Sequence, residues 1–453
     1  MGSTSTHPGN RRALLVESSA STIPILMTQG AIFTAIAVFF SVDVVGIAYA
    51  AAVPMVMQIA QLAGPSMIRA FRGPVRLFRF ATVLRWLWVV LIVAAIAGIR
   101  TPGVFFIVFV LTQAAAAVAG NAWMSILQAD LSEHERGSFF GTRNVVVSAT
   151  AVVAVPFMSV LLDVFPEPIN IVAVIVTGIA ANLVAWKAVG RIHEEPQEAL
   201  DARIPVREIW ADRPAKRMIV AFFVWNVILL FSAPYFAYHQ VVNLQIPMSL
   251  LGLATVGISL LTMASSKAWG LWADRIGTKS ITVIGVIVIA VTPIVWLLMN
   301  PRTWPLGLVA DVLLTSTGWG ALNVGMATLP MEVAPRDKIS GFYAVYFAIG
   351  ALGGLLGAAI GGAFAGLVEP LRFTAFGTDF FGLQILMLVA AGLRLLIIPV
   401  IHRIPTRRYV SPRHLMLNVL SVIARRSPVR PVEFGRITRF RVKGSKNDPV
   451  TQD

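Results

Sequence analysis

The sequence has 453 residues, of which 57% are hydrophobic and only 13% are charged. A soluble globular domain carries about 25% charged residues, so these numbers exclude a disordered chain and disfavour a soluble enzyme. The net charge of +15 is better explained by the basic loops of a membrane protein than by a nucleic-acid partner. The chain has no cysteine, which excludes disulfides, thiolate metal sites and cysteine nucleophiles.

Hydropathy along the chain predicts an all-α polytopic membrane protein with twelve transmembrane helices in two six-helix bundles. A helix needs about 20 mostly apolar residues to cross a bilayer. Candidate spans lie near residues 21–41, 44–64, 80–99, 103–127, 144–162, 169–188, 217–238, 250–270, 280–299, 305–330, 340–367 and 381–401. The first 20 residues contain no convincing cleavage site, so the first span is expected to be an uncleaved anchor.

The positions of Lys and Arg predict the orientation of these spans. If the N-terminus is cytoplasmic, the six outer loops hold only Arg100, Arg302 and Arg372, and the other 34 of the 37 basic residues (37 − 3) lie inside or near inner helix ends. The positive-inside rule therefore predicts that both termini are cytoplasmic. The high content of Ala, Val, Arg and Gly favours a prokaryotic inner membrane.

The predicted division of the chain follows from these spans. It comprises a cytoplasmic N-terminal segment at 1–20, a bundle at 21–188, a cytoplasmic linker at 189–216, a second bundle at 217–402 and a basic cytoplasmic tail at 403–453. The tail is expected to attract anionic membrane lipids. Its stretch 414–426 is either an interfacial helix or only a source of positive charge.

Two pairs of loops repeat between the halves. An acid, a base and an aromatic residue recur at an offset of 202, from Asp130 and Arg136-Gly137 after span 4 to Glu332 and Lys338 after span 10. After span 8 the chain reads Gly270-x-x-x-Asp274-Arg275-x-Gly277-x-Lys279. The matching place after span 2 has Ile68 and Phe71 where Asp and Gly would stand.

On twelve spans with a six-plus-six repeat, these loops resemble those of major facilitator superfamily transporters, over residues 20–402. The resemblance implies a monomeric secondary transporter, without cofactor, that moves a small organic solute by rocking two bundles about a central site. It also implies that the span 8–9 loop latches the inner gate, with Arg336 and Lys338 as counter-charges and Glu332 available to Arg275. Asp130 is the candidate for the anion that the N-terminal copy lacks.

The resemblance places the substrate cavity between spans 1, 4, 7 and 10, so polar and aromatic residues there are candidate ligands. They are Gln29, Thr34, Gln113, Asn121, Trp225, Asn226, Tyr235, Thr315, Trp319 and Asn323. The residues of span 10 step by four and form, with Asp311, one slowly turning stripe. Asp311 is the candidate for a coupling proton or a cationic substrate group. The alternative for each residue is a hydrogen bond to a neighbouring helix.

Other polar residues receive simpler interpretations. Arg85, Lys267 and Arg394 are expected to snorkel, with an anion site at Arg85 or Arg394 as the alternative. Tryptophans near the predicted interfaces are interpreted as membrane anchors, and His239 as part of an outer entrance without metal-ligand spacing. These tryptophans are Trp86, Trp88, Trp296 and Trp304. The glycine run 350–366 predicts close helix packing.

The sequence bears on two other classes of protein. An intramembrane enzyme is disfavoured because the sequence has no H-E-x-x-H, no G-x-S-x-G and no paired intramembrane carboxylates. A transporter-like assembly factor or sensor remains an alternative, because the N-terminal loop is incomplete and the basic tail is long. Within transport, a drug/proton exporter is disfavoured by the absence of arginine in span 4 and of a Gly-Pro-Gly motif in span 5, and an organic-anion carrier stays open.

Overall fold

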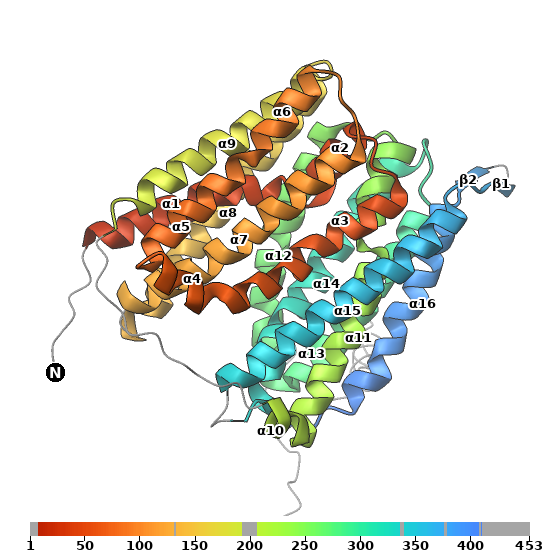
Figure 1. The fold of residues 1–453 in the computed structure, drawn as a ribbon. Coiled ribbons are helices and arrows are strands. Elements are labelled where there is room, and N and C mark those ends of the chain that lie inside the picture. Colours follow the sequence, from red (N-terminus) through yellow and green to blue (C-terminus); the bar gives the residue numbers. More distant parts are fainter. Residues whose placement is uncertain are drawn as a thin grey trace, which may run out of the picture. The chain divides into compact units, whose positions relative to one another are not determined.

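The computed structural model describes residues 8–130, 133–192, 206–335, 339–375, 378–406 and 409, and nearly all of them are helical (Figure 1). The predicted tail from residue 410 onward and the middle of the predicted linker, 193–205, lie outside this part of the chain.

The N-terminal half of the chain forms a series of shorter helices followed by three long ones. They are α1 (Pro8–Leu26), α2 (Gly30–Phe39), α3 (Val44–Met57), the 3₁₀ helix η1 (Gln58–Ala63), α4 (Gly64–Ala70), α5 (Pro74–Leu84), the 3₁₀ turn η2 (Arg85–Leu87), α6 (Trp88–Ile96), α7 (Pro102–Asp130), α8 (Glu133–Val164) and α9 (Ile169–Val189).

The C-terminal half has longer helices and one hairpin. Its elements are α10 (Val206–Ala211), α11 (Arg213–Tyr238), the π-helical turn η3 (His239–Asn243), α12 (Met248–Ile276), α13 (Thr278–Leu297), α14 (Trp304–Val333), α15 (Ile339–Val368), β1 (Arg372–Ala375), β2 (Thr378–Phe381) and α16 (Leu383–His402). The two strands pair antiparallel, with Arg372 opposite Phe381.

Ten helical segments of the described chain are long and apolar enough to cross a membrane, and a bent pair raises the number to eleven. The apolar helix α3 is shorter. The prediction of a polytopic all-α membrane protein is therefore confirmed, while the count of twelve and the orientation remain predictions. Exposed aliphatic side chains such as Leu306 (80% exposed) and Leu367 (75%) fit a surface surrounded by lipid rather than by water.

The bent pair consists of α1 and α2, which meet at 51°. Pro24 lies inside α1 and lacks the N–H that a helix interior needs, and Gly30 adopts φ +65°, a conformation that favours glycine. Helix α1 begins at Pro8, earlier than the predicted start of the first span. The stretch 17–21 is polar, so it lowers the hydropathy, yet it packs against α8 and α9.

Helices of each half pack mainly against one another. In the N-terminal half α1 contacts α8 and α9, and α7 contacts α3 and α5; in the C-terminal half α11 contacts α15, and α13 contacts α14 and α16. The predicted close packing of the glycine run is confirmed, because a Cβ at Gly357 would meet the carbonyl of Val227, and one at Gly361 the carbonyl of Phe231. Between the halves, α3 packs against α15 and α11, and α8 packs against α12.

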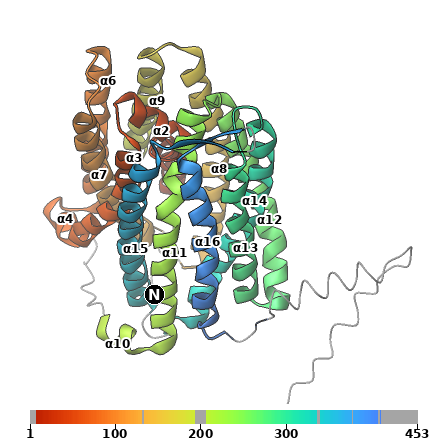
Figure 2. The ribbon, with the colours of Figure 1, turned by 90° about the vertical axis from the view of Figure 1, so that its right-hand side faces the viewer.

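The helical unit has two ends that differ in the elements they carry. The hairpin end carries β1, β2 and η3, and the linker end carries α10 and the α12–α13 turn (Figure 2).

Candidate functional site

The stripe on α14 rotates out of the helix bundle along its length. Asp311 is buried, Thr315 and Trp319 are half-buried, and Asn323 is exposed. A step of four residues turns a helix by about 40° beyond a full turn, so three steps turn the stripe by about 120°. The four residues therefore do not share one environment: the first faces neighbouring helices and the last faces open space.

Asp311 is held inside the C-terminal half. Its Oδ1 accepts hydrogen bonds from Trp296 Nε1 at 3.0 Å and from Thr315 Oγ1 at 2.9 Å. The interpretation of Trp296 as an interfacial anchor is wrong, because its ring is only 1% exposed and its N–H serves this carboxylate. The same interpretation is wrong for Trp88, which is also buried.

Arg394 is the second buried charge of this half. Its guanidinium donates to the carbonyl of Ile289 at 2.8 Å and to Ser232 Oγ at 3.3 Å, and it lies 5.3 Å from the ring centre of Phe236. The snorkelling interpretation is wrong, because Arg394 is only 4% exposed. In the part of the chain that the structure describes, no carboxylate lies within ion-pair distance of it.

The predicted ligands on α11 are buried. Trp225 packs edge to face with Trp319 at a centroid distance of 6.3 Å, which brings α11 and α14 together. Asn226 Nδ2 donates to the carbonyl of Phe222 at 2.8 Å, so this amide is satisfied within its own helix. Tyr235 is fully buried, and its hydroxyl has no hydrogen-bond partner among the described residues.

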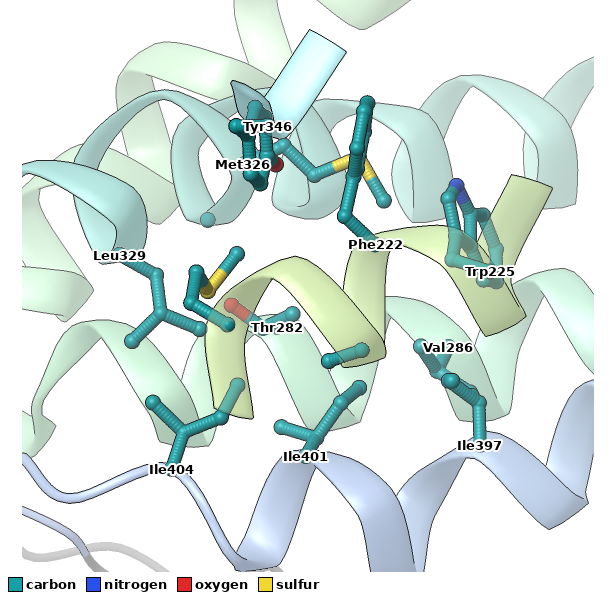
Figure 3. A pocket seen from close by; sticks show the side chains of 13 residues that line it. Phe222, Trp225, Thr282, Val286, Met326, Leu329, Tyr346, Ile397, Ile401 and Ile404 are labelled. Carbon is teal, nitrogen blue, oxygen red and sulfur yellow. The ribbon is translucent and has the colours of Figure 1, made fainter. Parts of the chain in front are cut away.

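A small cavity of about 30 Å³ lies beside Trp225, between α11, α13, α14, α15 and α16 (Figure 3). Its lining is mostly apolar, with Leu329, Ile397 and Ile401 around Thr282. Ligand pockets for organic solutes measure roughly 300–1,000 Å³. This cavity has room for about one water molecule and is not a solute site.

The predicted ligands of the N-terminal half differ in exposure. Gln29 is exposed, whereas Thr34 is buried and its hydroxyl donates to the carbonyl of Gly30 at 3.0 Å. Gln113 and Asn121 on α7 are half-buried. Thr34 thus has a partner within its helix, and the two α7 amides keep part of their surface open.

Sequence reasoning missed a buried acid on α1. Glu17 is 4% exposed, and its carboxylate accepts hydrogen bonds from Ser21 Oγ at 2.6 Å and from Ser18 Oγ at 3.3 Å. Arg143 of α8 donates from Nε to the same Ser18 hydroxyl at 3.1 Å, and both Arg143 and Arg85 act electrostatically on Glu17. The missed signal was a single acid among apolar and small residues directly before the expected first span.

The span 8–9 loop has the tight turn that its glycine predicts. Gly277 adopts φ +92° and both ends α12 and begins α13. Lys279 is buried, and its ammonium donates to the carbonyls of His402 at 2.6 Å and Ile404 at 2.9 Å, which caps the end of α16. This lysine therefore ties its loop to the same half of the chain.

The remaining gate candidates are placed only in part. Asp130 accepts a hydrogen bond from Asn10 Nδ2 at 2.7 Å, Arg275 and Glu332 are exposed, and Gly270 faces open space. The described part of the chain does not include Arg336 and Lys338. It also does not include the side-chain surroundings of Asp274, Arg136 and Gly137. The predicted ionic latch at this end thus stays a prediction.

His239 does not form an open entrance at the hairpin end. Its ring is fully buried, packs edge to face against Phe381 at 5.5 Å and shares a hydrogen bond of 3.0 Å between its Nδ1 and Asn243 Nδ2. Within the described residues there is no group of three or more His, Asp or Glu side chains that could hold a metal ion.

The two halves seal against each other at the hairpin end. On α8, between residues 140 and 164, every described buried residue lies in the segment 154–162, and on α12 no described residue beyond Gly252 is buried. Helices α8 and α12 therefore close on each other at their hairpin ends. Nearer the linker end their described residues are not buried, except Phe139 of α8, which packs inside the N-terminal half.

The chain belongs to the Major Facilitator Superfamily, whose profile matches residues 18–358. No curated protein sequence matches it. Among solved structures, the nucleoside transporter NupG has a TM-score of 0.67 at 14% identity, over 87% of this chain and 98% of that one. A bacterial homologue of the iron transporter ferroportin in the inward-facing state has a TM-score of 0.62 at 13% identity, over 88% and 98%. The same homologue in the outward-facing state scores 0.53 at 15% identity, over 87% and 98%.

These findings confirm the predicted family and fold. The chain is a multi-pass integral membrane transporter: its family is one of transporters, and its described helices are long and apolar enough to cross a membrane.

Proposed function

We propose that this protein is a secondary active transporter that moves a small organic solute by alternating access. The observation that carries the proposal is the one-sided burial of α8 and α12, which closes the hairpin end and leaves the linker end open. The better match to the inward-facing than to the outward-facing ferroportin homologue supports the same conformation. Two bundles that meet at one end and part at the other are the geometry that rocking requires.

The solute site in this proposal lies between α7 and α14. Asn323 and Trp319 of α14 and Gln113 and Asn121 of α7 keep exposed or half-exposed surface, whereas Asn226 and Thr34 are buried. Polar side chains inside a membrane protein generally face a neighbouring helix or a water-filled cavity. Amides beside an indole suit an amphipathic or ring-bearing solute.

An organic anion is the second candidate for the transported solute. Its support is the set of arginines inside the helices, above all Arg394 and Arg143. Arg394 feels the charge of Asp311 but has no carboxylate within ion-pair distance in the described chain, and Arg143 is half-buried beside Ser18. A buried guanidinium without a carboxylate is costly unless other groups or a ligand compensate it. A solute with a carboxylate or phosphate would supply that compensation.

Coupling to a proton or cation is part of the proposal. Asp311 and Glu17 are buried carboxylates, one in each half, and each accepts two hydrogen bonds from side chains. We place the hairpin end outside the cell and the linker end in the cytoplasm of a prokaryote, in agreement with the positive-inside rule. The protein is proposed to act as a monomer, with its tail near anionic lipids.

A thermal-shift screen of the purified protein in detergent tests the proposal. The panel holds nucleosides, sugars, amino acids, organic acids, lipophilic cations and metal chelates. A ligand that binds only the folded state adds about 2.7 kcal/mol of stability at 100 times its dissociation constant. We expect a hit that Asn323→Ala weakens and that Leu306→Ala, a change on the exposed face of the same helix, leaves intact.

Two outcomes of the screen would speak against an uncharged or cationic solute or against transport itself. A silent panel together with a protein that stays bound through purification would indicate an assembly factor or sensor. A hit restricted to carboxylates or phosphates, and weakened by Arg394→Gln, would select the anion carrier.

A further inference from the structure

The start of α12 receives its helix cap from the other half of the chain. Asp163, in the last turn of α8, accepts hydrogen bonds from the backbone N–H of Met248 at 2.9 Å and of Ser249 at 2.7 Å, one to each carboxylate oxygen. The residue at the capping position of α12 is Pro247, whose side chain has no hydrogen-bonding group and caps nothing. Helix α12 thus depends on a side chain 85 residues away for its first two donors.

Electrostatics favours this arrangement. The first N–H groups of a helix are not bonded within it, and they carry the positive end of its dipole. A carboxylate that accepts two of them makes charge-assisted hydrogen bonds, which are about twice as strong as neutral ones. Asp163 is exposed, so water replaces these bonds when the two helices separate, and the penalty for separation is the net strength of the two charge-assisted bonds.

The contact lies next to a close approach of α8 and α12. A Cβ at Gly252 would lie 2.6 Å from Ser159 Oγ and 3.3 Å from Pro156 Cα, so the small residue of α12 fits against the part of α8 that directly precedes the turn of Asp163. Ser159 is 1% exposed. The cap and the close approach occupy the short buried stretch that seals the hairpin end. In the stretches 140–153 of α8 and 253–276 of α12, no described residue is buried.

We propose that Asp163 is an inter-half latch that holds the hairpin end closed, and that this end opens only when the carboxylate leaves the start of α12. The inference rests on the proposed alternating access and names the group that must separate during it. Opening breaks two charge-assisted hydrogen bonds at once, and water or solvent-exposed headgroups replace them. The latch acts at the opposite end from the loop that contains Gly277.

The absence of native cysteine allows a direct test on the full chain. Spin labels at Ile99→Cys and Leu298→Cys, both exposed at the hairpin end in opposite halves, report opening there by double electron–electron resonance. A second pair, Lys187→Cys and Met331→Cys, reports the linker end. No solute is added, so a silent solute screen and a failed latch are separate results.

We expect Asp163→Asn to raise the ratio of open to closed molecules at the hairpin end about tenfold, the effect of losing roughly 1.4 kcal/mol. The linker-end distances should shorten in the same sample. Asp43→Asn is the matched control, because Asp43 caps α3 through Gly46 N at 2.7 Å within one half. It should leave both distance distributions unchanged.

A second variant removes the donor instead of the acceptor. Ser249→Pro deletes one N–H in the first turn of α12, where proline is tolerated. It should shift the hairpin-end distances toward the open state, as Asp163→Asn does. It also provides the test of the latch if Asp163→Asn does not fold. Unchanged hairpin-end distances in either folded variant, or an equal opening by Asp43→Asn, would overturn the latch.

Discussion

At the scale of single residues, the buried polar groups divide into those that hold helices together and those that could carry charge. Gln384 illustrates the first kind. It is fully buried, its Nε2 donates to the carbonyls of Leu297 at 2.8 Å and Met299 at 2.7 Å, and its Oε1 accepts from Phe381 N at 2.8 Å. One side chain thus provides hydrogen-bond partners for carbonyl groups at the end of α13 and for an N–H group just before α16. Backbone groups at helix ends have no partner within the helix itself.

Replacement of Gln384 by Leu should therefore destabilise the protein. Several buried backbone groups lose their partner, and each unsatisfied group costs roughly 1–3 kcal/mol. The measurement is the apparent melting temperature in detergent. Gln240→Leu is the control, since that half-buried amide makes no side-chain hydrogen bond to the described chain, and its melting temperature should change little. Equal losses in the two variants would refute the structural role of Gln384.

The two buried acids make a second prediction at this scale. Asp311→Asn keeps an oxygen that accepts hydrogen bonds from Trp296 and Thr315, so the fold should persist. The amide, however, cannot take up and release a proton as a carboxyl group does. With a solute identified in the thermal-shift screen, flux by this variant should lose its dependence on pH if Asp311 couples. Glu17→Gln is tested in parallel. If flux by one variant keeps its full pH dependence, that residue is excluded as the coupling group and the other remains the candidate.

At the scale of elements, glycines on α15 let whole helices approach. A Cβ at Gly357 would overlap the Val227 backbone of α11, and backbone cannot move aside as a flexible side chain can. Gly392 on α16 has the opposite setting, because no heavy atom lies within 4 Å of a Cβ built there. The same residue type thus has a packing role on one helix and none on another.

We expect Gly357→Ala to lower the stability by roughly 1–3 kcal/mol, the usual effect of overpacking. Gly392→Ala should be neutral or stabilising by up to about 1 kcal/mol, because alanine is the better helix former. Thermal unfolding of both variants in the same detergent makes the comparison. A Gly357→Ala protein as stable as Gly392→Ala would show that α11 and α15 are more loosely packed than the structure has them.

Much of the element level followed from sequence. The long apolar segments, the turn at Gly277 and the packing role of the glycine run were all predicted from local composition and spacing. The start of α1 at Pro8 and the break before Gly30 were not, since polar residues such as Glu17 and Ser18 lower hydropathy whether they face water or a neighbouring helix. Only the contacts with α8 show that this stretch is buried.

At the scale of the whole molecule, closure at one end predicts one-sided access. Asn323 is exposed, whereas Ser159 lies in the seal at the hairpin end. In the cysteine-free chain, Asn323→Cys should react with a membrane-impermeant maleimide added at the linker end, and Ser159→Cys should resist it from both sides. Inside-out and right-side-out vesicles supply the two sides.

This experiment also tests the proposed orientation. Faster labelling of Asn323→Cys in inside-out vesicles would agree with a cytoplasmic linker end. Faster labelling in right-side-out vesicles would reverse the orientation, and rapid labelling of Ser159→Cys from the hairpin end would contradict the closed seal.

The sequence by itself determined that this protein lies in a membrane, that it is built from apolar helices and that it resembles the family to which it belongs. These properties are local, because hydropathy, turn glycines and loop motifs act through residues that are neighbours in the chain. Only the tertiary structure decided that Arg394 and Trp296 are buried, that Arg143 of α8 lies beside the buried Glu17 and Ser18 of α1, and that Asp163 caps a helix of the other half. Each of those contacts joins segments far apart in sequence, and the charge or hydrogen bond that one segment needs is supplied by another that no local pattern identifies.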